Sequence, residues 1–260
     1  ILSAVQEKPV ATVAELVELT SSSEATIRRD IAALHLQKRL KRVRGGAEAN
    51  TPPQIVGLAG RPFSVNETMH AAQKRAIAKA AVELCRDGEP IIINGGTTTF
   101  QMVHFLANRR MPIFTNSFPI AEHLLKHSRN TVMLSGGTIY REQNIILSPF
   151  DNDVTRNFYA RRMYMGAQGL GPLGLMEGDP LLIQAEQKLI DQADDLIVLV
   201  DSSKFRQRSS LILCGLSRIA TVITDDGIED RDAKMLENAG VALIVAPVAG
   251  ERKEESSLQA

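Results

Sequence analysis

From about residue 71 onward, short apolar runs alternate with stretches of helical periodicity. The runs are rich in β-branched residues and lack polar alternation, which is typical of strands buried on both faces. Alternating strands and helices of this kind predict an α/β domain with a mostly parallel sheet. The predicted strands lie at 91–93, 113–115, 132–134, 163–165, 196–200, 222–224 and 241–245, and the predicted helices at 73–85, 100–107, 119–127, 181–193 and 231–239.

The first 47 residues instead show a pattern of short amphipathic helices. Thr12 is followed three residues later by Glu15, which is the spacing of a capping box. Three serines at 21–23 interrupt the chain, and Ser23 is placed to cap a further helix that runs to about residue 37. Two short helices joined by a tight polar turn predict a helix-turn-helix.

The second of these helices has two distinct faces. At a helical spacing Ile27, Ile31 and Leu34 fall on one stripe, and we expect all three to be buried. The opposite face combines alanines with arginines, which can reach guanine edges or phosphates in a DNA groove. The residues of this helix expected to lie at DNA are Ser23, Thr26, Arg28 and Arg29.

A basic segment follows the helix and ends in Gly45-Gly46. In it, charged residues alternate with Leu40 and Val43, which predicts a short ribbon or wing with an apolar face and a cationic face. The cationic face would neutralise phosphates without reading sequence. The wing residues expected to do so are Lys41, Arg42 and Arg44. The alternative is a small helical bundle with a solvated basic face, but helix lengths, caps and wing together favour DNA binding.

Charge is segregated along a chain that is neutral overall. The 260 residues include 30 basic and 30 acidic side chains, so binding to nucleic acid requires a local basic region. Residues 26–46 provide one, with seven basic side chains and one acidic. No apolar run approaches the roughly 20 residues of a membrane helix, so no membrane is expected as a partner. Cys85 and Cys214 lie far apart, which excludes a disulfide scaffold and a cysteine zinc site and fits a reducing cytoplasm.

Composition also suggests where the domains end. Residues 49–62 contain three prolines and two glycines without clean periodicity, which is typical of a linker. The last ten residues are polar, and such tails are commonly disordered. We therefore expect a winged helix-turn-helix at 1–50, a linker at 51–70, an effector-binding domain at 71–250 and a disordered tail at 251–260.

The clearest chemical motif is a predicted strand that runs into two glycines and three threonines. Glycines let the backbone approach a ligand, while free N–H groups, threonine hydroxyls and a following helix favour an anion. No lysine follows as in a Walker loop, and the glycine spacing does not match a dinucleotide site. The sequence favours a phosphate cradle over an ordinary strand-to-helix turn. Its residues are Asn94, Gly95, Gly96, Thr97, Thr98 and Thr99.

Three further predicted strands also end in polar residues. Asn116, Gly137 and Lys204 each follow a different strand. Parallel strands place their carboxyl ends at one edge of the sheet, where ligands bind. We expect Lys204 to supply a mobile cation for a phosphate, although a surface lysine is the alternative. The histidines show no metal-ligand spacing, so neither a metal ion nor a cofactor is expected.

Two stretches, 23–31 and 42–47, resemble the signature of the DeoR family of bacterial sugar-metabolism repressors, with Arg44 where the family often has His. The C-terminal part resembles the family's effector domain at 94–99, 115–117, 136–137, 166–169, 185–188 and 201–204, and is similar to the branch typified by the L-ascorbate utilisation repressor. The resemblance implies a fold like that of sugar-phosphate isomerases, without catalysis, which binds phosphorylated sugars. It implicates Gly95, Gly96, Thr97, Thr98, Asn116, Gly137 and Lys204, while Asn94 replaces a common Asp.

The favoured hypothesis is a transcriptional repressor of a carbohydrate catabolic operon, controlled by a phosphorylated sugar or sugar acid. The alternative is a sugar-phosphate isomerase or deaminase with an accessory basic module. No histidine follows the polar strand ends, although Asp201 and Glu186 remain as carboxylates, so we expect no catalytic residues. The expected partners are double-stranded operator DNA, the effector and a second copy in a homodimer or homotetramer, since one helix-turn-helix covers few base pairs. The expected location is the cytoplasm, at the nucleoid when bound to DNA.

Overall fold

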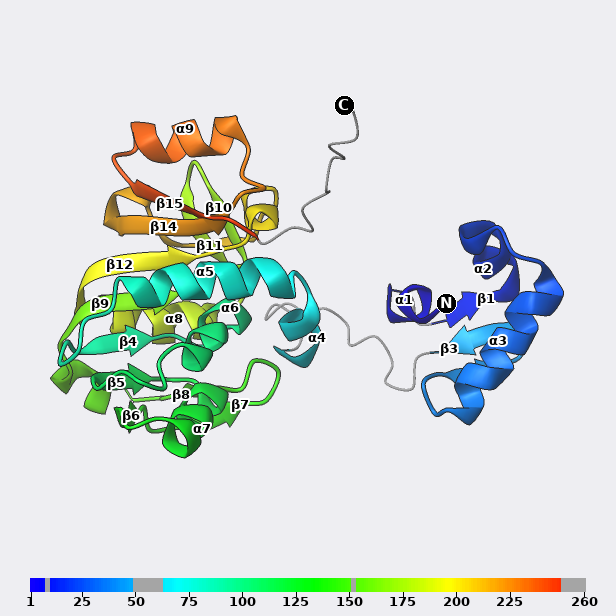
Figure 1. The fold of residues 1–260 in the computed structure, drawn as a ribbon, viewed down its shortest axis with the longest axis horizontal. Coiled ribbons are helices and arrows are strands. Elements are labelled where there is room, and N and C mark those ends of the chain that lie inside the picture. The colour runs from blue at the N-terminus through cyan, green and yellow to red at the C-terminus, as the bar shows by residue number, and fades with distance from the viewer. Residues whose placement is uncertain (8–9, 49–62, 151–152, 249–260) are drawn as a thin grey trace, which may run out of the picture. The chain divides into compact units, whose positions relative to one another are not determined.

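A computed structural model describes residues 1–7, 10–48, 63–150 and 153–248. The chain divides into two compact units, Ile1–Gly57 and Leu58–Ala260, which are described separately (Figure 1). The expected disordered tail and the expected linker up to residue 62 lie outside the described residues. From Phe63 the segment expected to be linker forms a helix, α4 (Phe63–Thr68), which packs against α6 (Thr97–Phe100).

The N-terminal unit is a winged helix-turn-helix. Its antiparallel sheet has the order β1-β3-β2, with β2 and β3 forming the wing. Thr12 and Glu15 form the predicted capping box, and the Ser23 hydroxyl accepts the backbone N–H of Thr26 as the cap of α3. The elements are α1 (Leu2–Glu7), β1 (Val10–Thr12), α2 (Val13–Thr20), α3 (Glu24–Leu36), β2 (Lys41–Val43) and β3 (Gly46–Glu48).

The core of this unit is small and confined to one side of α3. Ile27 and Ile31 are buried as predicted, together with Leu16 and the wing residue Leu40. Leu34 is only half-buried, so the expectation that it is fully buried is wrong. It packs at the margin of the core because so small a unit covers only the first turns of the helix.

The C-terminal unit is built on a seven-stranded parallel sheet. All seven predicted strand runs form its strands, in the order β15-β14-β12-β9-β4-β5-β6. Chain order reverses between β4 and β9, because β5 and β6 extend the sheet on one side and the later strands on the other. The bounds are β4 (Ile91–Ile93), β5 (Pro112–Thr115), β6 (Thr131–Leu134), β9 (Ala160–Met165), β12 (Ala193–Leu199), β14 (Ile219–Asp225) and β15 (Ala242–Ala246).

Helices cover both faces of this sheet (Figure 1). Ile91 and Ile93 point to one core, whereas Ile92 points to the other, as the two-residue period of a strand requires. The first core receives α5 (Ala71–Glu83), α7 (Phe118–His127) and the 3₁₀ turn η1 (Gln101–His104), and the second receives α8 (Pro180–Ile190) and α9 (Asp230–Asn238).

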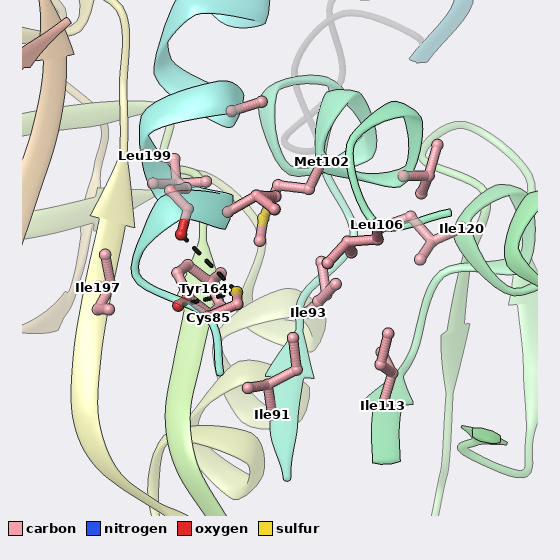
Figure 2. Packing of buried hydrophobic residues seen from close by; sticks show 14 of the residues in the cluster. Cys85, Ile91, Ile93, Met102, Leu106, Ile113, Ile120, Tyr164, Ile197 and Leu199 are labelled. Carbon is pink, nitrogen blue, oxygen red and sulfur yellow. Dashed lines mark hydrogen bonds between the residues drawn. The ribbon is translucent and has the colours of Figure 1, made fainter. Parts of the chain in front are cut away.

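The Cys85 thiol makes polar contacts inside the first core, with the Ala81 carbonyl and with the Tyr164 hydroxyl (Figure 2). The Cys85 thiol donates a hydrogen bond of 3.3 Å to the Tyr164 hydroxyl among Ile91, Ile93 and Ile197. Burial raises the pKa of the Cys85 thiol. The side chain therefore behaves as a packed, protonated group.

Short antiparallel segments that the sequence did not predict lie over the carboxyl edge of the sheet. Strands β7 and β8 form a hairpin, while β10, β11 and β13 form a separate small sheet. Three further 3₁₀ turns complete the described part of the unit. The bounds are β7 (Thr138–Tyr140), β8 (Ile145–Leu147), β10 (Gly169–Gly171), β11 (Gly174–Glu177), β13 (Leu211–Cys214), η2 (Val154–Asn157), η3 (Ser202–Phe205) and η4 (Leu216–Arg218). Among the described helices, none has the length and apolar character needed to cross a bilayer.

Candidate functional site

The predicted polar strand ends meet at the carboxyl edge of the sheet, beside the reversal between β4 and β9. In open parallel sheets this switch point is where ligands bind. The backbone N–H of Asn94 donates to the carbonyl of Tyr164 at 2.9 Å, which joins the two strands at that point. Asn116 follows β5 next to it, and Asp201 follows β12 on the other side.

The loop after β4 is tied to the end of β5 and to α8. The side-chain amide of Asn94 donates to Glu186 Oε1 at 2.8 Å, and the backbone N–H of Gly95 donates to Asn116 Oδ1 at 2.8 Å. Thr99 uses its hydroxyl inside the loop, since Oγ1 lies 2.7 Å from the Asn94 carbonyl and 3.0 Å from that of Gly96. The structure thus brings Asn94, Gly95 and Asn116 together and commits Thr99 to holding the loop.

The glycines of the cradle have different roles. A Cβ at Gly95 would lie 2.6 Å from Ile145 Cγ1, so this glycine allows the β7–β8 hairpin to pack over the loop. Gly96 precedes α6, and a Cβ there would meet only Thr99 Oγ1, at 3.1 Å. The helix expected at 100–107 is instead the four-residue α6 followed by η1, so the helix dipole contributes less than the sequence suggested.

The geometry of the β7–β8 hairpin requires glycine at position 137. Gly137 begins the hairpin with a φ of 142°, and a Cβ would lie 2.2 Å from the carbonyl oxygen of Leu147. Gly137 itself is exposed, whereas Asn94 and Asn116 are buried. Close pairing with β8 therefore accounts for the glycine without a ligand.

Buried polar atoms without partners gather at these strand ends. Among the described residues, several side-chain atoms that are shielded from solvent have no hydrogen-bond partner. Each such atom costs about 1–3 kcal/mol, which makes a cluster of them the mark of a ligand site. The atoms are Asn94 Oδ1, Asn116 Nδ2, Ser135 Oγ, Glu186 Oε2, Asp201 Oδ2 and Thr224 Oγ1.

The space beside Asn116 is narrow. A cavity bounded by Asn116, Ser135 and Lys188 has a volume of ≈ 20 Å³, which is room for about one water molecule. The hairpin is attached here through the backbone, because Ile146 N–H donates to the Asn116 carbonyl at 2.7 Å. A sugar bound in this cavity therefore requires the hairpin to shift.

Two buried carboxyl groups lie at the same edge. Burial raises the pKa of Glu177 to about 7 and that of Glu186 well above its usual value. The charge of Glu177 raises the pKa of Glu186 further, whereas Lys204 lowers that of Glu177. Glu186 was expected from the sequence as a possible carboxylate, whereas Glu177 was not, because its burial depends on the unpredicted β11.

Two lysines supply positive charge. Lys204 lies in η3, half-buried, and its ammonium donates to Gln207 Oε1 at 3.1 Å. Lys74, which was not predicted as a site residue, lies in the first turn of α5 and is only 4% exposed. Burial lowers the pKa of Lys74 to about 8, and the charge of Asp201 opposes this. A signal was present, because Lys74 precedes Ile77 and Ala78 by three and four residues and so shares their buried stripe.

The predicted DNA-contacting residues all lie on α3 or the wing. Arg28 and Arg29 are exposed, and Arg28 Nε donates to Glu24 at 2.9 Å, a surface ion pair that solvent weakens. Thr26 is half-buried and its hydroxyl lies 2.9 Å from that of Ser23. The wing residues Lys41, Arg42 and Arg44 are exposed.

The protein combines a winged helix-turn-helix with an α/β domain whose strand order reverses at a point where such sheets bind ligands. This combination defines a ligand-responsive transcriptional regulator. Residues 1–53 match the family described as the DeoR-like helix-turn-helix domain, and residues 69–226 match the DeoR C terminal sensor domain. The chain belongs to the DeoR family and is a DNA-binding transcriptional regulator of sugar catabolism. The resemblance found in the sequence is thereby confirmed.

Relatives cover nearly the whole chain. The HTH-type transcriptional regulators UlaR of Shigella dysenteriae serotype 1 and of Shigella sonnei are each 34% identical over 90% of this chain and 91% of their own. Similar solved structures cover less. They include ribose 5-phosphate isomerase A of Methanocaldococcus jannaschii (TM-score 0.37, 21% identity, 50% of this chain and 52% of that one) and eIF2B beta of Chaetomium thermophilum (TM-score 0.38, 14% identity, 54% and 41%).

Proposed function

We propose that this regulator represses a carbohydrate catabolic operon and that a phosphorylated sugar or sugar acid, bound at the carboxyl edge of the sheet, sets its affinity for operator DNA. The observation that carries the proposal is the group of unpartnered buried polar atoms of Asn94, Asn116 and Glu186 at the switch point, where Asn94 is bonded to Glu186 and Gly95 to Asn116. Lys204 and Lys74 add the positive charge that a phosphate requires.

The phosphate and the sugar of the effector are assigned to different sets of residues. The phosphate is assigned to Gly96, Thr97, Thr98 and Lys204, because glycine backbone, hydroxyls and a cation bind anions. The sugar is assigned to the amides and carboxyl of Asn94, Asn116 and Glu186, whose unpartnered atoms include both donors and acceptors for hydroxyl groups. A protonated Glu186 also donates a hydrogen bond.

An enzyme is the second candidate, since buried carboxyl groups with raised pKa values serve as general acids. The DeoR relatives are named as transcriptional regulators, which favours a site that binds without catalysis. In the regulator, the same carboxyl groups read the hydroxyl groups of the sugar. An assay for isomerisation or deamination of sugar phosphates separates the two candidates.

The DNA-binding unit is assigned to the major groove through α3, with Arg28 and Arg29 at base edges and the wing on phosphates. We place the active form as a homodimer or homotetramer, because a palindromic operator needs two such helices. The regulator acts in the cytoplasm and is located at the nucleoid when it is bound to DNA.

The test measures operator affinity with and without sugar phosphates. A DNA fragment from the promoter region next to the gene is titrated in gel shifts against a panel of phosphorylated sugars and sugar acids. We expect specific binding that one effector weakens, with no turnover of that compound. Specific binding that no compound alters would contradict effector control, and turnover without an effect on DNA would support the enzyme.

A further inference from the structure

Lys74 occupies an unusual position for a lysine. Its side chain is almost fully buried, and lysines are rarely buried without a charged partner. Within the described parts of the chain, no carboxylate lies within 4.0 Å of its ammonium. Its hydrogen-bond partner is the backbone carbonyl of Asn66, a neutral group in α4.

The surroundings of Lys74 point to the strand ends. The groups that act on its charge are Asp201 and Lys204 after β12 and Glu67 in α4. The helix that carries it packs against α6, which follows the Gly95-Gly96 loop directly. Lys74 is thus bonded to α4 and lies on the helix that packs against α6, next to the predicted cradle.

Three contacts connect helix α4 with the elements around the site. The Phe63 ring packs edge-on against Phe100 of α6, with 5.7 Å between ring centroids. The backbone N–H of Phe63 donates to the Glu142 carbonyl at the tip of the β7–β8 hairpin, at 2.9 Å. The third contact is the bond from Lys74 to Asn66. α4 is also the first described element after the segment that leads from the DNA-binding unit.

We infer that Lys74 is a second anion-binding cation of the sensor and that its ammonium joins a bound phosphate to α4. An ammonium has three protons, and the bond to Asn66 uses one. A phosphate between Lys74 and Lys204 would accept another, favour the charged state of Lys74 and strengthen the bond to Asn66. Occupancy of the site would therefore hold α4 more firmly, at the point where the chain leaves for the DNA-binding unit.

This inference rests on the proposed effector site and is tested on the full chain with inorganic phosphate. Calorimetry measures phosphate affinity, and hydrogen–deuterium exchange measures protection of the amides in α4. We expect phosphate to slow exchange in α4 of the wild type. Lys74→Met should weaken phosphate binding about tenfold or more, as loss of a charge-assisted hydrogen bond does, and should leave α4 insensitive to phosphate. Lys79→Met, an exposed lysine of the same helix, is the matched control.

The outcomes separate the two proposals. Two results would overturn the role of Lys74 and leave the effector site intact. The first is that phosphate binds the wild type and Lys74→Met equally. The second is that phosphate leaves hydrogen exchange in α4 of the wild type unchanged or makes it faster. If neither phosphate nor any sugar phosphate binds the wild type, the effector site itself is wrong. If Lys74→Met does not fold, the wild-type exchange experiment still decides, because it requires no variant.

Discussion

Phe63 of α4 meets Phe100 of α6 edge to face, with ring centroids 5.7 Å apart and the ring planes inclined by 82°. Phe100 closes the helix that starts at the predicted phosphate cradle. The pair therefore connects the loop after β4 with the first helix of the sensor domain.

Replacing Phe63 by leucine removes the edge-to-face contact but keeps an apolar side chain. Such aromatic pairs contribute about 0.5–1.5 kcal/mol beyond burial, so the free energy of unfolding of the sensor domain should fall by about that amount. Urea titration measures it. Phe150→Leu is the control because that ring is 71% exposed; equal losses in the two variants would show that the pair contributes nothing.

Glu177→Gln should stabilise the sensor domain at high pH. The folded-state pKa is raised to about 7 from a usual 4.5, so the wild type loses stability as pH rises from 4.5 through 7, where folding opposes ionisation. The glutamine of the variant does not titrate in this range. The free energy of unfolding of the variant should therefore exceed that of the wild type by about 1–3 kcal/mol at pH 8, with no gain at pH 4.5. Thermal melts across this pH range check it; an equal gain at both ends would assign the effect to packing rather than charge.

Arg28→Ala and Arg29→Ala should each weaken operator binding by about 1–3 kcal/mol and relax base preference. Lys41→Ala or Arg42→Ala should instead weaken binding to all duplexes alike and flatten the dependence on salt. Gel shifts on specific and random duplexes at two salt concentrations distinguish these effects. Arg86→Ala, exposed on the sensor domain, is the control, and wild-type affinity in both α3 variants would remove that helix from the interface.

Gly96→Val and Lys204→Ala should fold, bind operator and ignore the effector. The first places methyl groups where the phosphate is assigned, and its Cβ needs only a small shift of Thr99 Oγ1, at 3.1 Å. The second removes a counter-charge. The coupling between effector and operator, typically about 1–3 kcal/mol, should vanish in both. Gel shifts with and without effector test this, with Lys79→Ala as the control; a normal response in both variants would place the effector elsewhere.

Light scattering at micromolar concentration should give a dimer or tetramer, since each helix-turn-helix reads only one half-site. Gel shifts on half and full operators complete the test, because a dimer should bind the full site far more tightly. A monomer that binds a full operator with undiminished affinity would refute the assembly.

The strands and caps could be read from the sequence because local rules determine them. Seven apolar runs became seven strands, and Ser23 caps α3 as its position before a helical pattern predicted. The site was predicted in part, since parallel strands necessarily bring Asn94 and Asn116 to one edge. Glu177 was missed because its burial depends on β11, whose short pattern gives little signal. Lys74 lies on the buried stripe of α5, but nothing in the sequence shows that the short helix α4 supplies its hydrogen-bond partner.

Gly95 has a consequence for redesign. Its absent side chain is the space into which Ile145 fits. The hairpin that carries Ile145 is attached through backbone bonds at Asn116 and Asn144 and through the Tyr140 hydroxyl, which donates to Asp179 Oδ2 at 2.9 Å. Backbone bonds do not depend on which side chains the hairpin presents. A graft between Thr138 and Leu147 that keeps Tyr140 and Ile145 therefore offers a route to new sensor specificities without disturbing the sheet.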